Sequence, residues 1–380
     1  MKIPKGQTIK DLIIIGAGAA GLFLAANLKK NALILEQNNA VAKKLLISGG
    51  GKCNVTNENI NIKSYLCDDY DKLKQSLDEF SYQDNLNFFK GIKFNKIRNK
   101  QFFAPNSSLI LDRLLSQNKS KIMLNTKVLG LEKANNSYKI ITNKGEFLAK
   151  NVVIATGGIS FATLGVSDIA LKIAKEFQIG FSEFLPALVP LTLQKDEFFM
   201  KNLSGISIEV CINDIFKGSM LFTHKSISGP VVLSASLFWT KGKIKINFLN
   251  DFKIDFSSLK QASTHLSLPK AFIKEYLNAN NLSDKAMNKY NLEEKEIINK
   301  LYNYEFAPAG NLGFNKAEVC KGGVSLKSLN EHYESLKNKG LFFIGECLNV
   351  AGILGGFNIH FAFASAKKLA NYLNKELKDD

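Results

Sequence analysis

The N-terminal segment contains a strand, a glycine-rich turn, a helix and a second strand in direct succession, and this order limits the folds open to the chain. Residues 12–15 are an aliphatic run typical of a buried parallel strand. The run is followed by the pattern G-x-G-x-x-G, by helical composition at residues 22–30, and by a second apolar run that ends at Glu36. The spacing predicts a βαβ unit that binds a dinucleotide, within an α/β fold built on a doubly wound sheet.

Several residues of this segment have a physical task in binding a dinucleotide. Gly16 allows a tight turn, Gly18 lets the backbone approach a pyrophosphate, and Gly21 lets helix and strand pack closely. The N-terminus of the helix favours the phosphate charge, and Glu36 can accept hydrogen bonds from a ribose 2′-hydroxyl, which argues against a 2′-phosphate there. We predict cofactor contacts at these four positions and at the neighbouring Ala19, Ala20 and Gln37.

The same segment allows a different interpretation, as a signal peptide or a membrane anchor. Lysines precede an uncharged run at residues 12–28. The run has 17 residues, whereas a spanning helix needs about 20. Because the glycine pattern is followed by an acid at the expected distance, we favour the cofactor interpretation and expect no contact with a membrane.

A second glycine-rich segment bears on which dinucleotide is bound. Three consecutive glycines within residues 43–57 are costly in a regular helix or strand. They suit a backbone wrapped closely around a ligand, although a flexible loop has a similar composition. The cofactor contacts predicted here are Lys44, Ser48, Gly49, Gly50, Gly51, Lys52, Cys53 and Asn54.

Several short strands are predicted between residues 121 and 155. Residues 127–132, 137–142 and 146–148 are separated by turn signals, and a buried strand at 152–155 follows them. A β-meander followed by such a strand is the order seen in flavin-binding doubly wound folds. The predicted cofactor contacts of this region are Val128, Thr156, Gly157 and Gly158.

A second succession of strand, glycine turn and helix lies near the C-terminus. The strand is predicted at residues 341–344, the turn at 352–356 and the helix at 362–373. The N-terminus of such a helix can face a flavin ring and stabilise negative charge on it, although glycines also serve close helix packing. Glu346, after the strand, can hold ribityl hydroxyls. The predicted contacts are Gly345, Glu346, Gly355, Gly356, Phe357 and Asn358.

Five motifs occur in order: L-L-I-S-G-G-G-K-C-N-V-T-N at residues 45–57, A-T-G-G at 155–158, L-F-T-H-x-x-x-S-G-P at 221–230, A-E-V-x-x-G-G-V at 317–324 and G-E-x-L-x-x-x-G-x-x-G-G-F-N at 345–358. This combination resembles the bacterial BaiN-like (YhiN-type) family of NAD(P)/FAD-dependent oxidoreductases, also labelled aminoacetone-oxidase-like flavoproteins. The resemblance covers residues 11–370 and implies non-covalently bound FAD. NAD(P)H, as a transient electron donor, must bind without its own domain, because no second G-x-G-x-x-G with strand context occurs.

The resemblance also implies three parts, which the sequence supports independently. An FAD-binding domain is expected at residues 1–187 and 319–380, interrupted by a β-barrel-like domain at 188–250 and 304–318. A small helical domain at 251–303 is nested within the barrel. Residues 188–249 contain strand-like stretches. In the helical part, apolar residues recur at near-helical spacing, namely Phe272, Tyr276, Ile297, Ile298 and Leu301.

The chain departs from the family pattern at four places. From Ile159 to Ala170 the usual glycines and proline after A-T-G-G are thinned. Cys320 replaces a threonine, Asn349 replaces an aspartate, and His360 stands where glutamine is commoner. We expect the protein to bind FAD despite these changes. We expect the changes to affect which substrate is used and how active the enzyme is.

A flavin enzyme takes its redox power from the cofactor, so the protein supplies orientation and protons. His224, in the third motif, is the first candidate for a general acid or substrate ligand, and His360 is the second. His265 and His332 have polar sequence neighbours and are expected at the surface. Cys53 is interpreted as a packing residue, because disulfide reductase chemistry needs a second nearby cysteine.

Composition limits the remaining classes of protein. The five cysteines are scattered without a C-x-x-C pair, which argues against a disulfide framework or a metal site and favours a reducing cytoplasm. The net charge is +16, but Arg98 and Arg113 are the only arginines. Because base and phosphate recognition favour arginine, we expect a small molecule rather than nucleic acid as the partner, and we attribute the charge mainly to lysines spread along the chain.

The sequence therefore predicts an FAD-dependent oxidoreductase, with three hypotheses for its reaction. The first is NAD(P)H-linked reduction of a conjugated C=C or C=O bond in a small apolar molecule. The second is oxidation of an amine or amino-ketone by O₂, and the third is a flavoprotein acting on RNA. The oligomeric state, monomer or homodimer, is left open.

Overall fold

The computed structural model describes residues 9–97 and 100–377 and divides into two compact units. Unit 1 is formed by Met1–Pro186 and Glu318–Asp380, and unit 2 by Ala187–Ala317. Unit 2 is thus an insertion into the sequence of unit 1. Arg98, one of the two arginines, lies outside the described residues.

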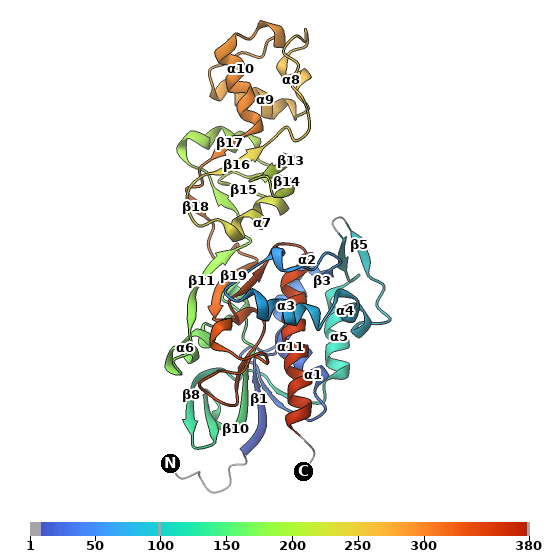
Figure 1. Ribbon diagram of the computed structural model, residues 1–380, viewed down its shortest axis with the longest axis vertical. Coiled ribbons are helices and arrows are strands. Elements are labelled where there is room, and N and C mark those ends of the chain that lie inside the picture. Colours follow the sequence, from blue (N-terminus) through green and yellow to red (C-terminus); the bar gives the residue numbers. More distant parts are fainter. Residues whose placement is uncertain (1–8, 98–99, 378–380) are drawn as a thin grey trace. The chain divides into compact units, whose positions relative to one another are not determined.

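Unit 1 is centred on a sheet of seven strands (Figure 1). Its parallel strands are β7 (Lys121–Met123), β2 (Leu33–Leu35), β1 (Ile9–Ile15), β10 (Gly145–Ile154) and β20 (Leu341–Phe343). An antiparallel meander adds β9 (Ser137–Thr142) and β8 (Val128–Ala134). The central strands are buried aliphatic runs, as expected for parallel strands covered on both faces. The predicted α/β fold with a doubly wound sheet is confirmed.

Strand β10 joins the parallel and antiparallel parts of this sheet. Along one edge it pairs with β1, while its other edge pairs first with β9 at residues 145–149 and then with β20 at residues 152–154. The prediction of two separate strands at 146–148 and 152–155 was wrong. Residues 149 and 151, between them, keep their pairing with β1, so the chain stays extended throughout.

Helix α1 (Ala19–Asn27) packs between α5 (Ser107–Gln117) and α11 (Phe357–Glu376). The ring of Phe23 on α1 stacks on that of Phe363 on α11, with centroids 4.5 Å apart. Helix α11 begins five residues earlier than predicted, directly after Gly356, whose φ is +96°. Phe357, Asn358 and His360 therefore lie in the helix, and their side chains follow its geometry.

The remaining elements of unit 1 surround these helices and the sheet. They are α2 (Lys43–Gly51), β3 (Asn54–Asn57), β4 (Tyr65–Cys67), α3 (Tyr70–Asp78), α4 (Tyr82–Phe88), β5 (Asn95–Ile97), β6 (Gln101–Phe103), α6 (Ile169–Glu176), β11 (Phe181–Ala187), β19 (Val319–Val324) and β21 (Val350–Gly352). Strands β3, β6 and β5 form a small antiparallel sheet, β11 pairs with β19, and β21 pairs with β4.

Unit 2 is built on an antiparallel sheet of seven strands. In spatial order they are β17 (Tyr304–Phe306), β16 (Ile244–Asn247), β13 (Ser207–Ile212), β14 (Phe216–Phe222), β15 (Ser226–Ser228), β12 (Leu191–Thr192) and β18 (Gly310–Asn311). Helix α7 (Pro230–Phe238) packs on β14, and α8 (Ala262–His265), α9 (Lys270–Ala279) and α10 (Leu292–Asn299) follow along the chain. The ring of Phe272 on α9 contacts Phe222 and Phe248, so these helices share one hydrophobic core with the sheet.

No helix in the described parts of the chain combines the length and the apolar character needed to cross a membrane.

Candidate cofactor and active site

The turn between β1 and α1 has the geometry that a pyrophosphate requires. Gly16 has a φ of +107°, and a Cβ atom there would lie 2.5 Å from the carbonyl oxygen of Ala155. A Cβ atom at Gly21 would lie 2.0 Å from the carbonyl oxygen of Gly16, so strand and helix leave no room for a side chain. Around Gly18 nothing lies within 4 Å of such an atom, and no side chain caps α1. The first N–H groups of α1 are therefore left for an anion.

Glu36 lies beside this turn, at the end of β2, with 7% of its surface exposed. Its Oε2 accepts a hydrogen bond from the N–H of Ala17 at 2.8 Å, and its Oε1 accepts one from the N–H of Asn38 at 2.8 Å. The carboxylate is thus fixed near the start of α1, and each oxygen keeps a lone pair for a ribose hydroxyl.

The hydroxyl of Thr156, at the end of the neighbouring strand β10, is buried and has no hydrogen-bond partner among the described residues. An unpaired buried hydroxyl costs about 1–3 kcal/mol. A ligand that fills this region would remove the cost. The orphaned hydroxyl, the uncapped helix and the open space at Gly18 together fit a bound dinucleotide.

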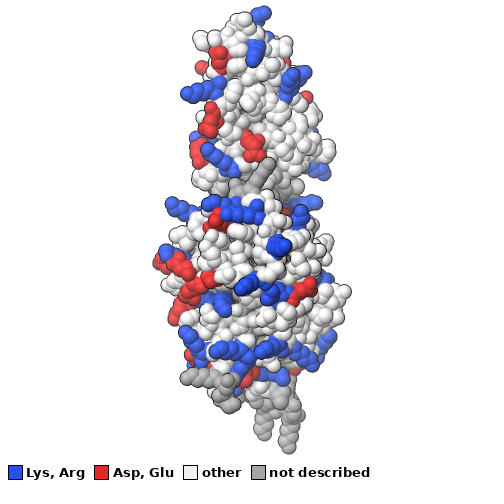
Figure 2. Space-filling model, turned by 90° about the vertical axis from the view of Figure 1, so that its right-hand side faces the viewer, with Lys and Arg blue, Asp and Glu red and all other residues white. Residues whose placement is uncertain are grey.

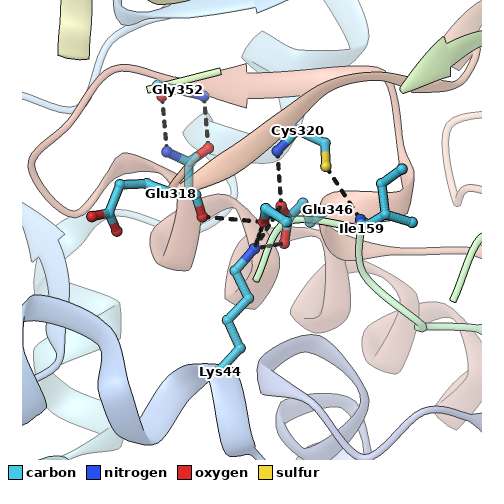
Figure 3. A network of polar contacts seen from close by, with 8 residues as sticks. Lys44, Ile159, Glu318, Cys320, Glu346 and Gly352 are labelled. Carbon is cyan, nitrogen blue, oxygen red and sulfur yellow. Dashed lines mark hydrogen bonds and ion pairs between the residues drawn. The ribbon is translucent and has the colours of Figure 1, made fainter. Parts of the chain in front are cut away.

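Lys44, Glu346 and Ser160 form a polar cluster on the adjoining side of the site (Figure 3). The Nζ atom of Lys44 lies 2.8 Å from both carboxylate oxygens of Glu346 and 2.5 Å from the Oγ of Ser160. A Cβ atom at Gly158 would lie 3.2 Å from Oε1 of Glu346, so this glycine lets the A-T-G-G segment approach the carboxylate. The side chains of Lys44 and Glu346 keep 32% and 20% exposure, which leaves both accessible to a ligand.

Cys320, one of the departures from the family pattern, supports this cluster. Its backbone N–H donates to Oε1 of Glu346 at 3.1 Å, and its sulfur accepts a hydrogen bond from the N–H of Ile159 at 3.2 Å. Burial, together with the nearby Glu346, raises the pKa of the thiol to about 11. Cys320 therefore stays protonated and holds the backbone, a task that a threonine hydroxyl can also perform.

The triple-glycine segment forms an open turn at the end of α2. Gly49, Gly50 and Gly51 all have positive φ, between 57° and 81°, which is the region that glycine tolerates best. Gly50 and Gly51 have open space where a Cβ atom would stand. Cys53 closes the turn with its N–H on the carbonyl oxygen of Ser48 at 3.0 Å. Burial raises the pKa of its thiol to about 12, which supports a packing role over redox chemistry.

The turn before α11 packs against the segment that follows the triple glycine. A Cβ atom at Gly356 would lie 2.6 Å from the carbonyl oxygen of Thr56, and the amide of Asn57 donates to the carbonyl oxygen of Gly355 at 3.0 Å. The side chain of Asn358 bonds both the N–H and the carbonyl oxygen of Gly352 at 2.8 Å, so it closes the turn itself. No side chain caps α11, and its first N–H groups can face negative charge.

A pocket of about 400 Å³ opens beside Val128. Its volume lies in the range of small-ligand sites. The lining residues are Lys127, Val128, Leu129, Ile159, Val166, Ser167, Asp168, Ile169 and Lys172. The side chains of Gln37 and Asn38 donate to the carbonyl oxygen of Gly165. These hydrogen bonds join the segment of residues 159–170 to the residues that follow β2. The family departure at residues 159–170 therefore alters the wall of a pocket close to Glu36.

The two predicted catalytic histidines lie in very different surroundings. His224 is exposed on the bend between β14 and β15 of unit 2. His360 is fully buried, its Nε2 donates to the carbonyl oxygen of Phe80 at 3.0 Å, and its Nδ1 accepts from the hydroxyl of Thr56 at 2.8 Å. Burial lowers its pKa to about 4. A neutral, enclosed imidazole with both nitrogens engaged does not support the predicted role as general acid.

Other predicted residues have simpler positions. Lys52 is exposed beside the triple glycine, Phe357 is buried against Tyr65, and Gly345 packs on Ala20 in the first turn of α1. His265 and His332, expected at the surface, are half-buried. All five cysteines are free, and the described residues contain no cluster of three acidic, histidine or cysteine side chains able to hold a metal ion.

Sequence reasoning missed Ser160, Gln101 and Phe103. Ser160 is fully buried and contacts Lys44; its place two residues after Gly158 was the available signal. Gln101 and Phe103 on β6 contact the glycine turns at Gly355 and Gly49. Neither residue belongs to a sequence motif. The small sheet of β3, β6 and β5 brings both to the site.

The glycine turn after β1 and the turn that begins at Gly345 after β20 come from opposite ends of the chain. They meet at the carboxyl ends of the parallel strands, where Gly345 packs on Ala20. This arrangement is that of a dinucleotide-dependent flavoprotein fold. The chain belongs to the family of HI0933-like proteins, whose Rossmann-domain model matches residues 10–372. The family inferred from the five motifs is confirmed.

Several curated relatives match nearly the whole chain. A ribosomal RNA dihydrouridine synthase of Haemophilus influenzae is 32% identical, in an alignment that covers 96% of this chain and 98% of the relative. A ribosomal RNA dihydrouridine synthase of Escherichia coli is 31% identical over 94% of this chain and 96% of its own length. A 3-dehydro-bile acid delta(4,6)-reductase of Clostridium scindens is 28% identical over 93% of this chain and 96% of its own length.

The fold has a counterpart among solved structures. The 3-ketosteroid-delta4-(5alpha)-dehydrogenase from Rhodococcus jostii aligns with a TM-score of 0.57 over 99% of this chain and 98% of that one, at 11% identity. This likeness shows the fold alone. The family and the relatives make the protein an FAD-dependent oxidoreductase.

Proposed function

We propose that the protein reduces a C=C bond conjugated to a carbonyl group, and that this bond lies in a uracil base of ribosomal RNA. The observation that carries the proposal is the similarity, over nearly the whole chain, to two ribosomal RNA dihydrouridine synthases at 32% and 31% identity. Dihydrouridine forms when two hydrogen atoms add across the C5=C6 bond of uracil, which is conjugated to the C4 carbonyl. The net charge of +16 suits a polyanionic substrate.

This proposal reverses the order of two hypotheses drawn from the sequence. The scarcity of arginine made RNA a less favoured substrate than a small molecule, because arginine recognises base edges best. An enzyme that unstacks its target base and recognises it in a pocket needs few such contacts. A lysine-rich surface is sufficient to bind the phosphate backbone.

We propose further that FAD is held by the cluster of glycine turns in unit 1. Gly18 and the uncapped start of α1 would bind the pyrophosphate, and Glu36 a ribose hydroxyl. The pocket beside Val128 has the size for the adenine, and Glu346 with Lys44 would hold the ribityl and phosphate groups. The first turn of α11 would stabilise negative charge on the ring.

The reduction needs two electrons and two protons. Reduced flavin supplies a hydride to the C=C bond, and NAD(P)H is the proposed source of that hydride. A protein group or water must supply the second proton to the other carbon. His224 stays the proposed donor, because its side chain is exposed, whereas that of His360 is enclosed.

A second candidate is the reduction of a conjugated bond in a small apolar molecule. The 28% identity to a 3-dehydro-bile acid delta(4,6)-reductase favours it. Oxidation of an amine or amino-ketone by O₂ stays a further hypothesis from the sequence.

The test combines purified flavoprotein, NADPH and ribosomal RNA from cells that lack the gene, without oxygen, followed by mass spectrometry of the nucleosides. We expect dihydrouridine to appear only with enzyme, NADPH and RNA together. An unsaturated 3-keto steroid serves as the alternative substrate. Consumption of NADPH with the steroid and none with RNA would overturn the proposal and select the second candidate. Peroxide formation with a primary amine would select the oxidase.

A further inference from the structure

Much of the positive charge is concentrated in one segment of unit 1. Between residues 90 and 121, the described residues include seven Lys or Arg side chains and one acidic side chain, Asp112, a net charge of +6 (7 − 1). The seven are Lys90, Lys93, Lys96, Lys100, Arg113, Lys119 and Lys121. Among the lysines spread along the chain, this segment therefore has a high local net charge.

The seven side chains belong to elements that lie together. Arg113 on α5 donates a hydrogen bond to the carbonyl oxygen of Lys90, which joins the segment before β5 to α5. Lys96 and Lys100 belong to the hairpin β5–β6, and Lys119 and Lys121 follow α5 directly. Figure 1 draws α4, α5 and β5 on one side of unit 1, and Figure 2 faces that side, where blue side chains are frequent. We call this set of seven residues the α5 surface.

Most of this charge is not neutralised. Glu58 pairs with Lys96 at 2.9 Å and with Lys100 at 3.5 Å, and Asp84 is engaged in capping α4. Within the described residues, the remaining lysines of the α5 surface form no ion pair, and all are exposed; they are Lys90, Lys93, Lys119 and Lys121. Four lysines are thus available to a polyanion.

Strand β6 links the α5 surface to the candidate flavin site. A Cβ atom at Gly49 would lie 2.9 Å from the ring of Phe103, and one at Gly355 would lie 3.4 Å from the side-chain amide of Gln101. Residue Lys96 is paired with Phe102 across the hairpin. Lys96 on β5 is therefore one strand away from both glycine turns.

An aromatic pair accompanies the lysines on this path. The rings of Tyr82 and Phe102 stack with centroids 5.8 Å apart, both are half-buried, and the Nζ of Lys96 lies 5.8 Å from the Phe102 ring. Sites for single-stranded nucleic acid combine a basic surface with aromatic rings on which bases stack.

We propose that the α5 surface binds the phosphate backbone of ribosomal RNA and that β6 is the route by which the target base reaches the flavin. The inference rests on the proposed function. Phosphate contacts position an enzyme without reading sequence, so lysine serves as well as arginine here. The base itself must leave its stack to be reduced, which favours a single-stranded loop as the target.

The test compares two variants of the full-length flavoprotein that lose the same charge. The surface variant carries Lys90→Gln, Lys93→Gln, Lys119→Gln and Lys121→Gln. The control variant carries Lys133→Gln, Lys175→Gln, Lys327→Gln and Lys337→Gln, four exposed lysines on β8, on α6 and in the segment between β19 and β20. The dissociation constant of a fluorescent single-stranded RNA and of deproteinised ribosomal RNA is measured between 50 mM and 300 mM salt.

We expect the surface variant to bind RNA at least about tenfold more weakly and to lose about 3 from the slope of log K against log salt, since single strands give about 0.7 per contact. The control variant should change binding by less than about twofold. Flavin content and NADPH oxidation by a small quinone should stay the same in both. Equal weakening in both variants, or in neither, would overturn the inference.

The outcomes separate this inference from the proposed function. If wild-type protein forms dihydrouridine and the surface variant binds and reduces RNA normally, the proposed function stands and the RNA-binding role of the α5 surface is wrong. If the surface variant loses RNA binding but wild-type protein forms no dihydrouridine, the binding surface stands and the proposed reaction fails.

Discussion

The Nζ atom of Lys44 lies 2.8 Å from both carboxylate oxygens of Glu346, although 302 residues separate the two in the sequence. The pair joins the start of α2 to the end of β20, the two segments that precede the two glycine turns. It therefore holds the parts of the site that come from opposite ends of the chain. Its partial exposure leaves both groups within reach of a ligand.

We predict that Lys44→Met weakens FAD binding about tenfold, or about 1.4 kcal/mol. The substitution keeps most of the length of the side chain but leaves a carboxylate without its partner beside an anionic cofactor. Titration of the apoprotein with FAD, followed by quenching of flavin fluorescence, measures the effect. Lys150→Met is the control, because Lys150 pairs with Asp11 at 2.9 Å in an exposed position. Unchanged FAD affinity in Lys44→Met would show that the pair only supports the fold.

Gly18 and Gly21 should respond differently to the same substitution. A Cβ atom at Gly18 meets nothing within 4 Å, so Gly18→Ala should fold with a stability within about 0.5 kcal/mol of wild type. It should bind FAD at least about tenfold more weakly, because the methyl group occupies the approach to the pyrophosphate. Gly21→Ala should instead destabilise the apoprotein by several kcal/mol, since its Cβ atom would lie 2.0 Å from a carbonyl oxygen. Urea unfolding of the apoproteins and FAD titration separate the two effects. Equal losses of stability would contradict this account.

A feature of the fold could be predicted from the sequence when neighbouring residues alone determine it. The turn at Gly16, Gly18 and Gly21 was predictable, because its backbone needs are set within a few residues. The start of α11 was not, since the left-handed Gly356 is fixed by the backbone of Thr56, about 300 residues away in the sequence. The predicted helix consequently began five residues late and left His360 outside it, after the turn expected to face the flavin.

The charge of the α5 surface could be counted in the sequence, because its seven side chains fall within residues 90–121. The packing that joins its loop, hairpin, helix and strand could not be predicted from that count. Gln101 and Phe103 contact the glycine turns through the small sheet of β3, β6 and β5, which has no sequence motif. Residues of this kind need the three-dimensional structure to be recognised.

His224→Gln tests the proposed proton donor. We expect turnover with the natural substrate to fall about 10²- to 10⁴-fold, the usual contribution of a general acid. FAD affinity should stay unchanged, because His224, on the bend between β14 and β15, is not among the residues proposed to hold FAD. The rate of flavin reduction by NADPH and the pH profile of turnover are the readouts. His265→Gln is the matched control. A normal turnover in His224→Gln would assign the proton to water.

His360 should make the stability of the protein depend on pH in a defined direction. Burial lowers its pKa from 6.5 to about 4, so the folded state resists a proton that the unfolded chain binds. Its contribution to stability is therefore complete above pH 6.5 and is lost as the pH falls towards 4, with a total of about 3 kcal/mol. Urea unfolding at pH 7.5, 6.0 and 5.0 measures this loss in wild type and in His360→Gln. Asp84 and the other carboxylates titrate in both proteins, so the difference between the two isolates the imidazole. If the two proteins lost stability in parallel over this range, the enclosed neutral state of His360 would be wrong, and a proton-exchanging role would be open again.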